Sequence, residues 1–79
     1  MKLETAKHQI DIAENIGYLI YERDKSGEKT SWKCIVDYVK SCGWEVDNWL
    51  HVRGSLQILI DNKLVKRTNN VHKEEYIRA

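Results

Sequence analysis

Three stretches of the chain repeat apolar residues at the spacing of a helix, and two short stretches near its end read as strands. The predicted elements are a first helix at about residues 5–24, a second at about 31–42, a third at about 47–62 and a hairpin at about 64–78. The pattern therefore predicts one mainly α domain over residues 1–79, in which three helices precede a two-stranded antiparallel hairpin.

Each predicted helix has an apolar face that is expected to point into the core. The faces comprise Ile10, Ala13, Ile16, Gly17 and Ile20 in the first helix, Trp32, Ile35, Val36 and Val39 in the second, and Trp49, Val52, Leu56, Leu59 and Ile60 in the third. Ile12 and Leu19 widen the arc of the first helix beyond what one small core requires. One explanation is that part of that helix contacts a second subunit and forms a homodimer. The alternative is that Leu19 and Tyr21 pack under the next loop.

The ends of these elements carry residues that suit turns and caps. Gly27 and Gly43 follow the first two helices and can adopt a positive φ. Ser31, or Thr30 before it, can cap the second helix. Asn62 can adopt the left-handed conformation that reverses the chain after the third helix. The hairpin beyond this turn is expected to pack on the helices through Leu64 and either Tyr76 or Ile77.

The run Leu56-x-x-Leu59-Ile60-Asp61-Asn62-Lys63-Leu64-Val65-Lys66-Arg67 joins the third helix to the hairpin. It resembles the winged helix-turn-helix superfamily, in which a recognition helix and a turn are followed by Leu-Val-x-Arg entering the wing. The resemblance covers roughly residues 30–78 and implies a small transcriptional regulator of bacterial, phage or mobile-element type. The third helix would lie in the DNA major groove and the wing on the backbone. Lys63 departs from the pattern, because a Gly is common there.

The net charge of +1 is unevenly distributed along the chain. Residues 1–50 hold seven Lys or Arg and nine Asp or Glu, whereas residues 51–79 hold six and three. The basic excess thus lies in the part that would contact double-stranded DNA. An excess of this size also occurs as ordinary surface variation.

Polar residues of the third helix and the wing are the candidate DNA contacts. They are Asn48, His51, Arg53 and Ser55 on the outward side of the helix, and Lys66, Arg67, Asn70 and Lys73 in the wing. Asn and Arg side chains can pair with adenine and guanine, His51 and Ser55 suit backbone or water-mediated contacts, and the wing cations would neutralise phosphates. Gln57 is placed towards the far side of the helix. Polar residues on an exposed helix face also occur without any partner.

Two residues near the start of the third helix have a structural and a functional interpretation. Asp47 or Asn48 is the expected helix cap, and Asn48 is also a candidate base contact. Gly54 in mid-helix predicts either close packing against another helix or close approach of the DNA backbone.

Catalytic, metal and cofactor sites are not expected from this sequence. No Ser-His-Asp spacing, glycine-rich phosphate loop or H-E-x-x-H occurs, and the three histidines are scattered. Cys34 and Cys42, on one predicted helix, would be about 12 Å apart, which is too far for a disulfide. The chain has neither a transmembrane-length apolar run nor a signal-peptide pattern at its N-terminus, so a cytoplasmic location and no membrane partner are expected.

A protein-binding winged helix is the alternative function. It would serve as a docking module, such as a phage-encoded inhibitor of a host or defence protein. The near-neutral charge, the broad apolar arc of the first helix, and Glu74 and Glu75 beside the wing favour this alternative.

Overall fold

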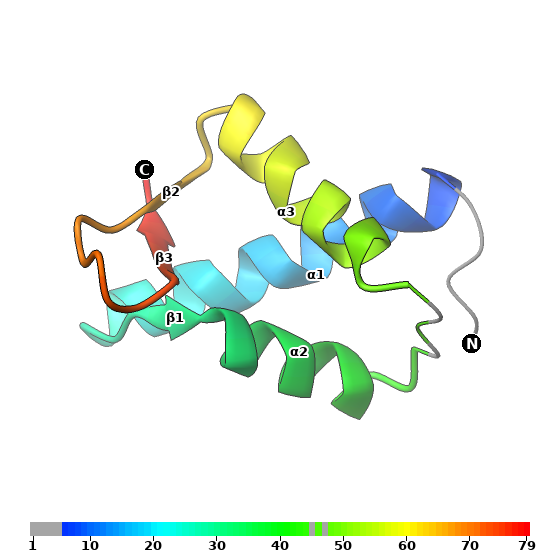
Figure 1. Cartoon of the computed structure of the whole chain (residues 1–79), viewed down its shortest axis with the longest axis horizontal. Coiled ribbons are helices and arrows are strands. Elements are labelled where there is room, and N and C mark those ends of the chain that lie inside the picture. Colours follow the sequence, from blue (N-terminus) through cyan, green and yellow to red (C-terminus); the bar gives the residue numbers. More distant parts are fainter. Residues whose placement is uncertain (1–5, 45, 47) are drawn as a thin grey trace.

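The computed structural model describes residues 6–44, 46 and 48–79, which form three helices and a small three-stranded antiparallel sheet (Figure 1). In chain order the elements are α1 (Ala6–Lys25), β1 (Thr30–Ser31), α2 (Trp32–Ser41), α3 (Leu50–Asp61), β2 (Val65–Arg67) and β3 (Glu75–Arg78). The mainly helical class and the element order agree with the sequence prediction. The arrangement is compatible with a winged helix.

The sheet has one strand more than the predicted two-stranded wing. Its order is β1-β3-β2, so β3 is central and pairs Thr30 with Tyr76 on one side and Arg67 with Tyr76 on the other. Trp32 extends the β1 pairing by donating its backbone N–H to the Glu74 carbonyl at 3.1 Å. The prediction missed β1 because two polar residues are too few to show the alternation that reveals a longer strand.

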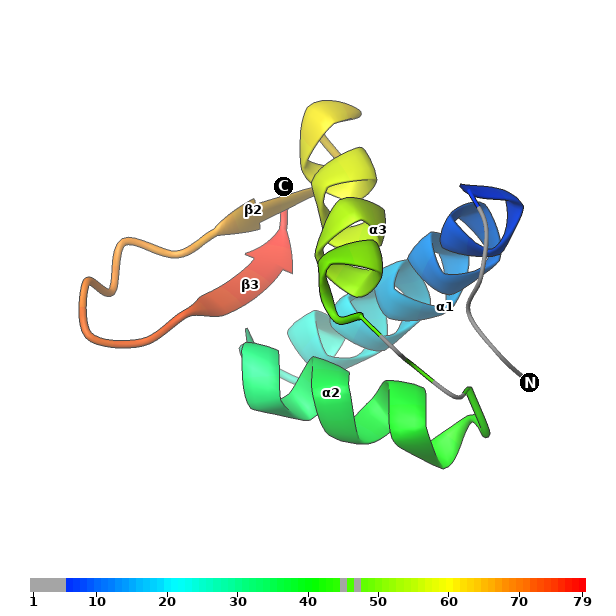
Figure 2. The same ribbon diagram turned by 45° about the vertical axis from the view of Figure 1, so that its right-hand side comes forward.

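The core lies between α1, α3 and the inner face of the sheet, with α2 closing one side (Figure 2). Its buried apolar residues are Ile12, Ala13, Ile16 and Ile20 of α1, Ile35 and Val39 of α2, Val52, Leu56 and Leu59 of α3, and Val65 and Tyr76 of the sheet. Two predicted positions are wrong. Ile10 is 58% exposed, because it lies at the edge of the α1 arc, and Leu64 is 45% exposed, because Val65 and Tyr76 fill the space beneath the hairpin.

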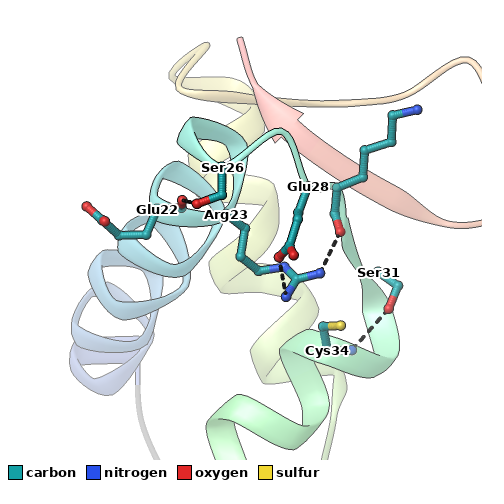
Figure 3. Close-up of polar contacts among 7 residues, drawn as sticks. Glu22, Arg23, Ser26, Glu28, Ser31 and Cys34 are labelled. Carbon is teal, nitrogen blue, oxygen red and sulfur yellow. Dashed lines mark hydrogen bonds and ion pairs between the residues drawn. The ribbon is translucent and has the colours of Figure 1, made fainter.

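The connection from α1 to α2 is held by short polar contacts (Figure 3). The Arg23 guanidinium donates to the Lys29 carbonyl at 3.0 Å and approaches the Glu28 carboxylate at 3.2 Å. Ser31 then caps α2, as predicted, because its Oγ accepts the Cys34 backbone N–H at 3.2 Å. These contacts fix the point at which β1 turns into α2, and so fix where α2 lies beside the sheet.

Each helix ends at a residue with a positive φ. Gly27 after α1 and Gly43 after α2 have φ values of 78° and 83°, which confirms the predicted positive φ of both glycines. After α3 the left-handed residue is Lys63, with φ 59°, and not the predicted Asn62. The Leu64 N–H bonds back to the Leu59 carbonyl at 2.9 Å and the Lys63 N–H to the Ile60 carbonyl at 3.0 Å. This pattern of two bonds requires the left-handed residue one place after Asn62.

Replacing Lys63 by Gly is expected to stabilise the fold. A left-handed conformation costs a residue with a Cβ about 1–2 kcal/mol, which glycine avoids. Because glycine also gains freedom in the unfolded chain, we expect a net gain of about 1 kcal/mol in the free energy of unfolding. Urea unfolding measures it, and Lys66→Gly on the neighbouring strand should destabilise instead. A less stable Lys63→Gly variant would contradict this account of the turn.

Candidate nucleic-acid interface

The hairpin of β2 and β3 presents positive charge to solvent. Lys66, Arg67 and Lys73 are exposed, and none of them forms a salt bridge with any residue that the structure describes. The two acidic residues of the hairpin are less accessible to solvent than these cations. Glu74 and Glu75 are both half-buried and held by hydrogen bonds. The hairpin therefore offers three exposed cations that could contact phosphates.

The tip of this hairpin is organised by its own side chains. Thr68 Oγ1 donates to the Glu75 carboxylate at 2.9 Å and accepts the Asn70 N–H at 3.4 Å. The Asn70 side-chain oxygen accepts the His72 N–H at 2.9 Å. The predicted contact residue Asn70 thus shapes the turn, and Val71 beside it is 85% exposed at the tip.

The outward face of α3 lies about 150° around the helix from the predicted one, which is nearly half a turn. Leu50 is 70% exposed, and Arg53, Gln57 and Asp61 are exposed along the same side. The Gln57 amide donates to the Asp61 carboxylate at 2.8 Å. Sequence reasoning missed Leu50 and misplaced Gln57, although a stripe at residues 50, 53, 57 and 61 has helical spacing and lies opposite the buried face.

Ser55 was predicted on this outward face, and that prediction is wrong. The residue is fully buried, with an exposure of 0%. Its hydroxyl lies 2.8 Å from the Gln9 carbonyl of α1, to which it donates, and 3.3 Å from the His51 carbonyl. The helical spacing of the sequence indicates this burial, because position 55 is three residues after buried Val52 and four before buried Leu59.

Gly54 also faces α1. A Cβ at this position would lie 2.9 Å from Gln9 Nε2, the end of a flexible side chain. The contact supports the packing explanation of this glycine and leaves the DNA explanation without a structural basis.

Asn48 and His51 lie at the start of α3. Asn48 is exposed, and its side-chain oxygen accepts the Leu50 N–H at 2.9 Å, so it supports the first turn of the helix. His51 is half-buried on the side that faces α1, and its carbonyl accepts from the Gln9 amide at 3.3 Å. The alternative cap, Asp47, lies outside the described residues. Of Asn48 and His51, only Asn48 is exposed.

Arg53 connects α3 to the wing. Its guanidinium donates to both carboxylate oxygens of Glu74, at 2.9 and 3.4 Å, and lies over the Trp32 ring at 4.0 Å from the centroid. Tyr76 donates its hydroxyl to the same carboxylate at 2.9 Å. The predicted base-reading arginine is therefore occupied, and Glu74 neutralises the only cation in the described part of α3.

The Arg53–Glu74–Tyr76 contacts shift the pKa values of two groups in opposite directions. Burial tends to raise the pKa of Glu74, but the hydrogen bonds from Arg53 and Tyr76 outweigh it and hold this pKa below its usual value. Burial and the hydrogen bond to Glu74 raise the pKa of Tyr76 to about 12. The carboxylate and the neutral phenol are thus the stable forms at neutral pH.

The raised pKa of Tyr76 predicts a loss of stability in alkali. A phenol with a pKa of about 10 in the unfolded chain and about 12 in the folded one stabilises the fold below pH 10. This contribution is lost as the pH rises towards 12. Tyr76→Phe should cost about 1 kcal/mol at pH 7 through the lost hydrogen bond, but should lack this alkaline loss. Urea unfolding at several pH values compares the two, and equal alkaline slopes would contradict the assignment.

Metal and membrane sites do not emerge from the described residues. No group of three or more His, Cys, Asp or Glu lies together there in a way that could hold a metal ion. Cys34 and Cys42 are both free thiols. None of the described helices is long and apolar enough to cross a membrane.

Comparison with known proteins identifies no relative of this chain. No protein-family model, curated protein or solved structure matches the chain.

Proposed function

We propose that this chain is a small winged-helix protein that binds double-stranded DNA, with the wing as its principal phosphate-binding element. The observation that carries the proposal is the group of three exposed cations on one hairpin, Lys66, Arg67 and Lys73, none of which forms a salt bridge with a described residue. Phosphate neutralisation supplies most of the affinity of non-specific DNA binding, and it requires cations that are free of intramolecular partners. A role as a transcriptional regulator follows if the bound DNA is an operator.

In this proposal α3 supplies sequence preference and little charge. Gln57 on the outward side of α3 and Asn48 just ahead of the helix have exposed amide side chains, and amides can read adenine in the major groove. Asp61 at the far end of α3 repels phosphate, so the helix depends on the wing for attraction. His51 and Ser55 are not part of the proposed surface, because both face α1.

The direct test measures binding of the folded protein to labelled mixed-sequence duplex by fluorescence anisotropy at about 50 and 200 mM salt. Three phosphate contacts per chain predict a slope of about −2.7 for the logarithm of the binding constant against the logarithm of salt concentration. A folded protein that shows no binding at the lower salt would exclude the proposal.

Releasing Arg53 should strengthen binding. Glu74→Gln removes a negative charge and frees the guanidinium, so we expect a gain of about tenfold at 50 mM salt and a slope steeper by about one. Glu75→Gln is the matched control, because it removes the same charge from the next residue, which is bonded to Thr68 and not to Arg53. Equal effects of the two substitutions would show that Arg53 has no part in binding.

Protein docking on the same surface is the second candidate function. It is favoured by the low charge of α3, where Arg53 is neutralised, and by the apolar side chains of Leu50 and Val71, which are 70% and 85% exposed. A phage-encoded inhibitor of a host protein would suit such a surface. Leu50→Lys separates the two functions, since it should strengthen DNA binding and abolish docking of a protein on this face.

A further inference from the structure

A second surface lies on α1, away from the wing. A groove of about 630 Å³ runs along this helix and is completed by α3, the turn after it and β3. Its exposed apolar side chains include Tyr18 at 66%, Ile10 at 58% and Leu64 at 45%. Side chains of this size gathered along one groove form a continuous apolar surface, which is typical of a protein contact.

The polar residues of this groove limit what can occupy it. Glu14, Tyr18, Tyr21 and Lys25 all line the groove, and their spacing of four, three and four places them in one straight row on α1. In chain order the row reads acid, aromatic, aromatic and base. The spacing of four, three and four is the same when the row is read from either end. In an antiparallel copy of the row, each acid would therefore lie opposite a base and each tyrosine opposite a tyrosine.

We propose that a second copy of this chain docks antiparallel along the α1 groove, with Glu14 of each copy facing Lys25 of the other. A two-fold interface of this kind brings the same patch of both subunits together and forms each contact twice. Tyr18 and Tyr21, the latter with the Arg78 guanidinium over its ring at 5.7 Å, form its aromatic centre, and the two ion pairs lie at its ends. The row spans about 16 Å of helix.

The isolated chain leaves these end charges available. Lys25 contacts only Glu22 among the described acidic residues, at 3.7 Å, and both side chains are about half exposed or more. Such surface pairs contribute little and exchange readily. Glu14 is exposed and forms no salt bridge within the described part of the chain. Both groups can therefore pair across the interface without breaking a buried contact.

The test is the mass in solution of the full chain, measured by sedimentation equilibrium over a range of concentrations. The wild-type chain should dimerise. Glu14→Lys and Lys25→Glu should each weaken the dimer by about tenfold or more, because two-fold symmetry replaces two attractions by two repulsions. Lys33→Glu on α2, outside the groove, should leave the dimer unchanged. A wild-type chain that remains monomeric at millimolar concentration would overturn the proposal.

Mixing the two charge variants tests the antiparallel register itself. Equal amounts of Glu14→Lys and Lys25→Glu chains should form a heterodimer with the wild-type constant, because every end contact then joins opposite charges. The double variant Glu14→Lys/Lys25→Glu should dimerise with itself for the same reason. Charge variants that dimerise as well as the wild type, or that fail to recover on mixing, would exclude this register.

This inference is independent of the proposed DNA binding. Its measurements contain no nucleic acid, and Glu14 and Lys25 lie outside the wing and the outward face of α3. Thermal unfolding of each variant, followed by circular dichroism, identifies any loss of fold. Failure of the dimer would therefore leave the wing proposal standing, and failure of DNA binding would leave the dimer standing.

Discussion

Replacing Lys66 and Lys73 by Gln should weaken duplex binding by about a hundredfold at 50 mM salt, and should reduce the salt slope by about 1.8. Lys66 on β2 and Lys73 in the turn before β3 are exposed and form no salt bridge within the described residues, so their removal costs the fold little. Arg67 is kept, because its charge acts on Glu74 and Tyr76. Anisotropy titrations at several salt concentrations measure both quantities.

The matched control for this experiment lies on α2. Lys33→Gln together with Lys40→Gln removes the same charge from exposed positions outside the proposed surface. If the wing cations act through their position, the control should change affinity far less than the wing variant. Equal losses would mean that only the total charge matters, and the wing would lose its assigned role.

Ile16→Ala should destabilise the domain by about 3 kcal/mol. Ile16 has an exposure of 0% beneath α3 and the sheet, and its truncation removes buried contacts and leaves a cavity. A domain of this length has a total stability of roughly 4–12 kcal/mol. The loss should therefore lower the melting temperature by about 12–24 °C.

Ile10→Ala is the control for that substitution. The same change is made on the same helix, so the difference in helix propensity is the same, but Ile10 is 58% exposed. We expect an effect within about 0.5 kcal/mol. Thermal unfolding at low protein concentration, at which the proposed dimer would dissociate, makes the comparison. Similar losses for both variants would contradict the described burial of α1.

The helices could be predicted because several apolar residues in each of them recur at the helical spacing. Val52, Leu56 and Leu59 fix the face of α3 whatever the neighbouring residues do. β1 was not predictable, since its two residues are defined by backbone bonds to β3 and carry no apolar signal. The turn after α3 was assigned one residue early, because Asn favours a left-handed conformation locally whereas the hydrogen bonds to α3 impose it on Lys63.

The candidate interface was less predictable than the fold. The wing cations were found from composition, and the exposure of Lys66 follows from its place on the face of β2 opposite buried Val65. The pairing of Arg53 with Glu74 joins residues 21 positions apart and has no local signature. Ser55 was misplaced because a small polar residue on a helix suggests exposure, although its hydroxyl satisfies a carbonyl on the neighbouring helix.

The central position of β3 has a consequence for the order of folding. The β1–β3 pairing joins residues 30 and 76, which are far apart in sequence, whereas the α-helices form from local contacts. The entropy of closing this long loop is offset only once packing has brought α1, α3 and β2 together. We therefore expect the sheet to assemble late in folding. In that step β3 pairs both with β1, which precedes α2, and with β2 of the wing.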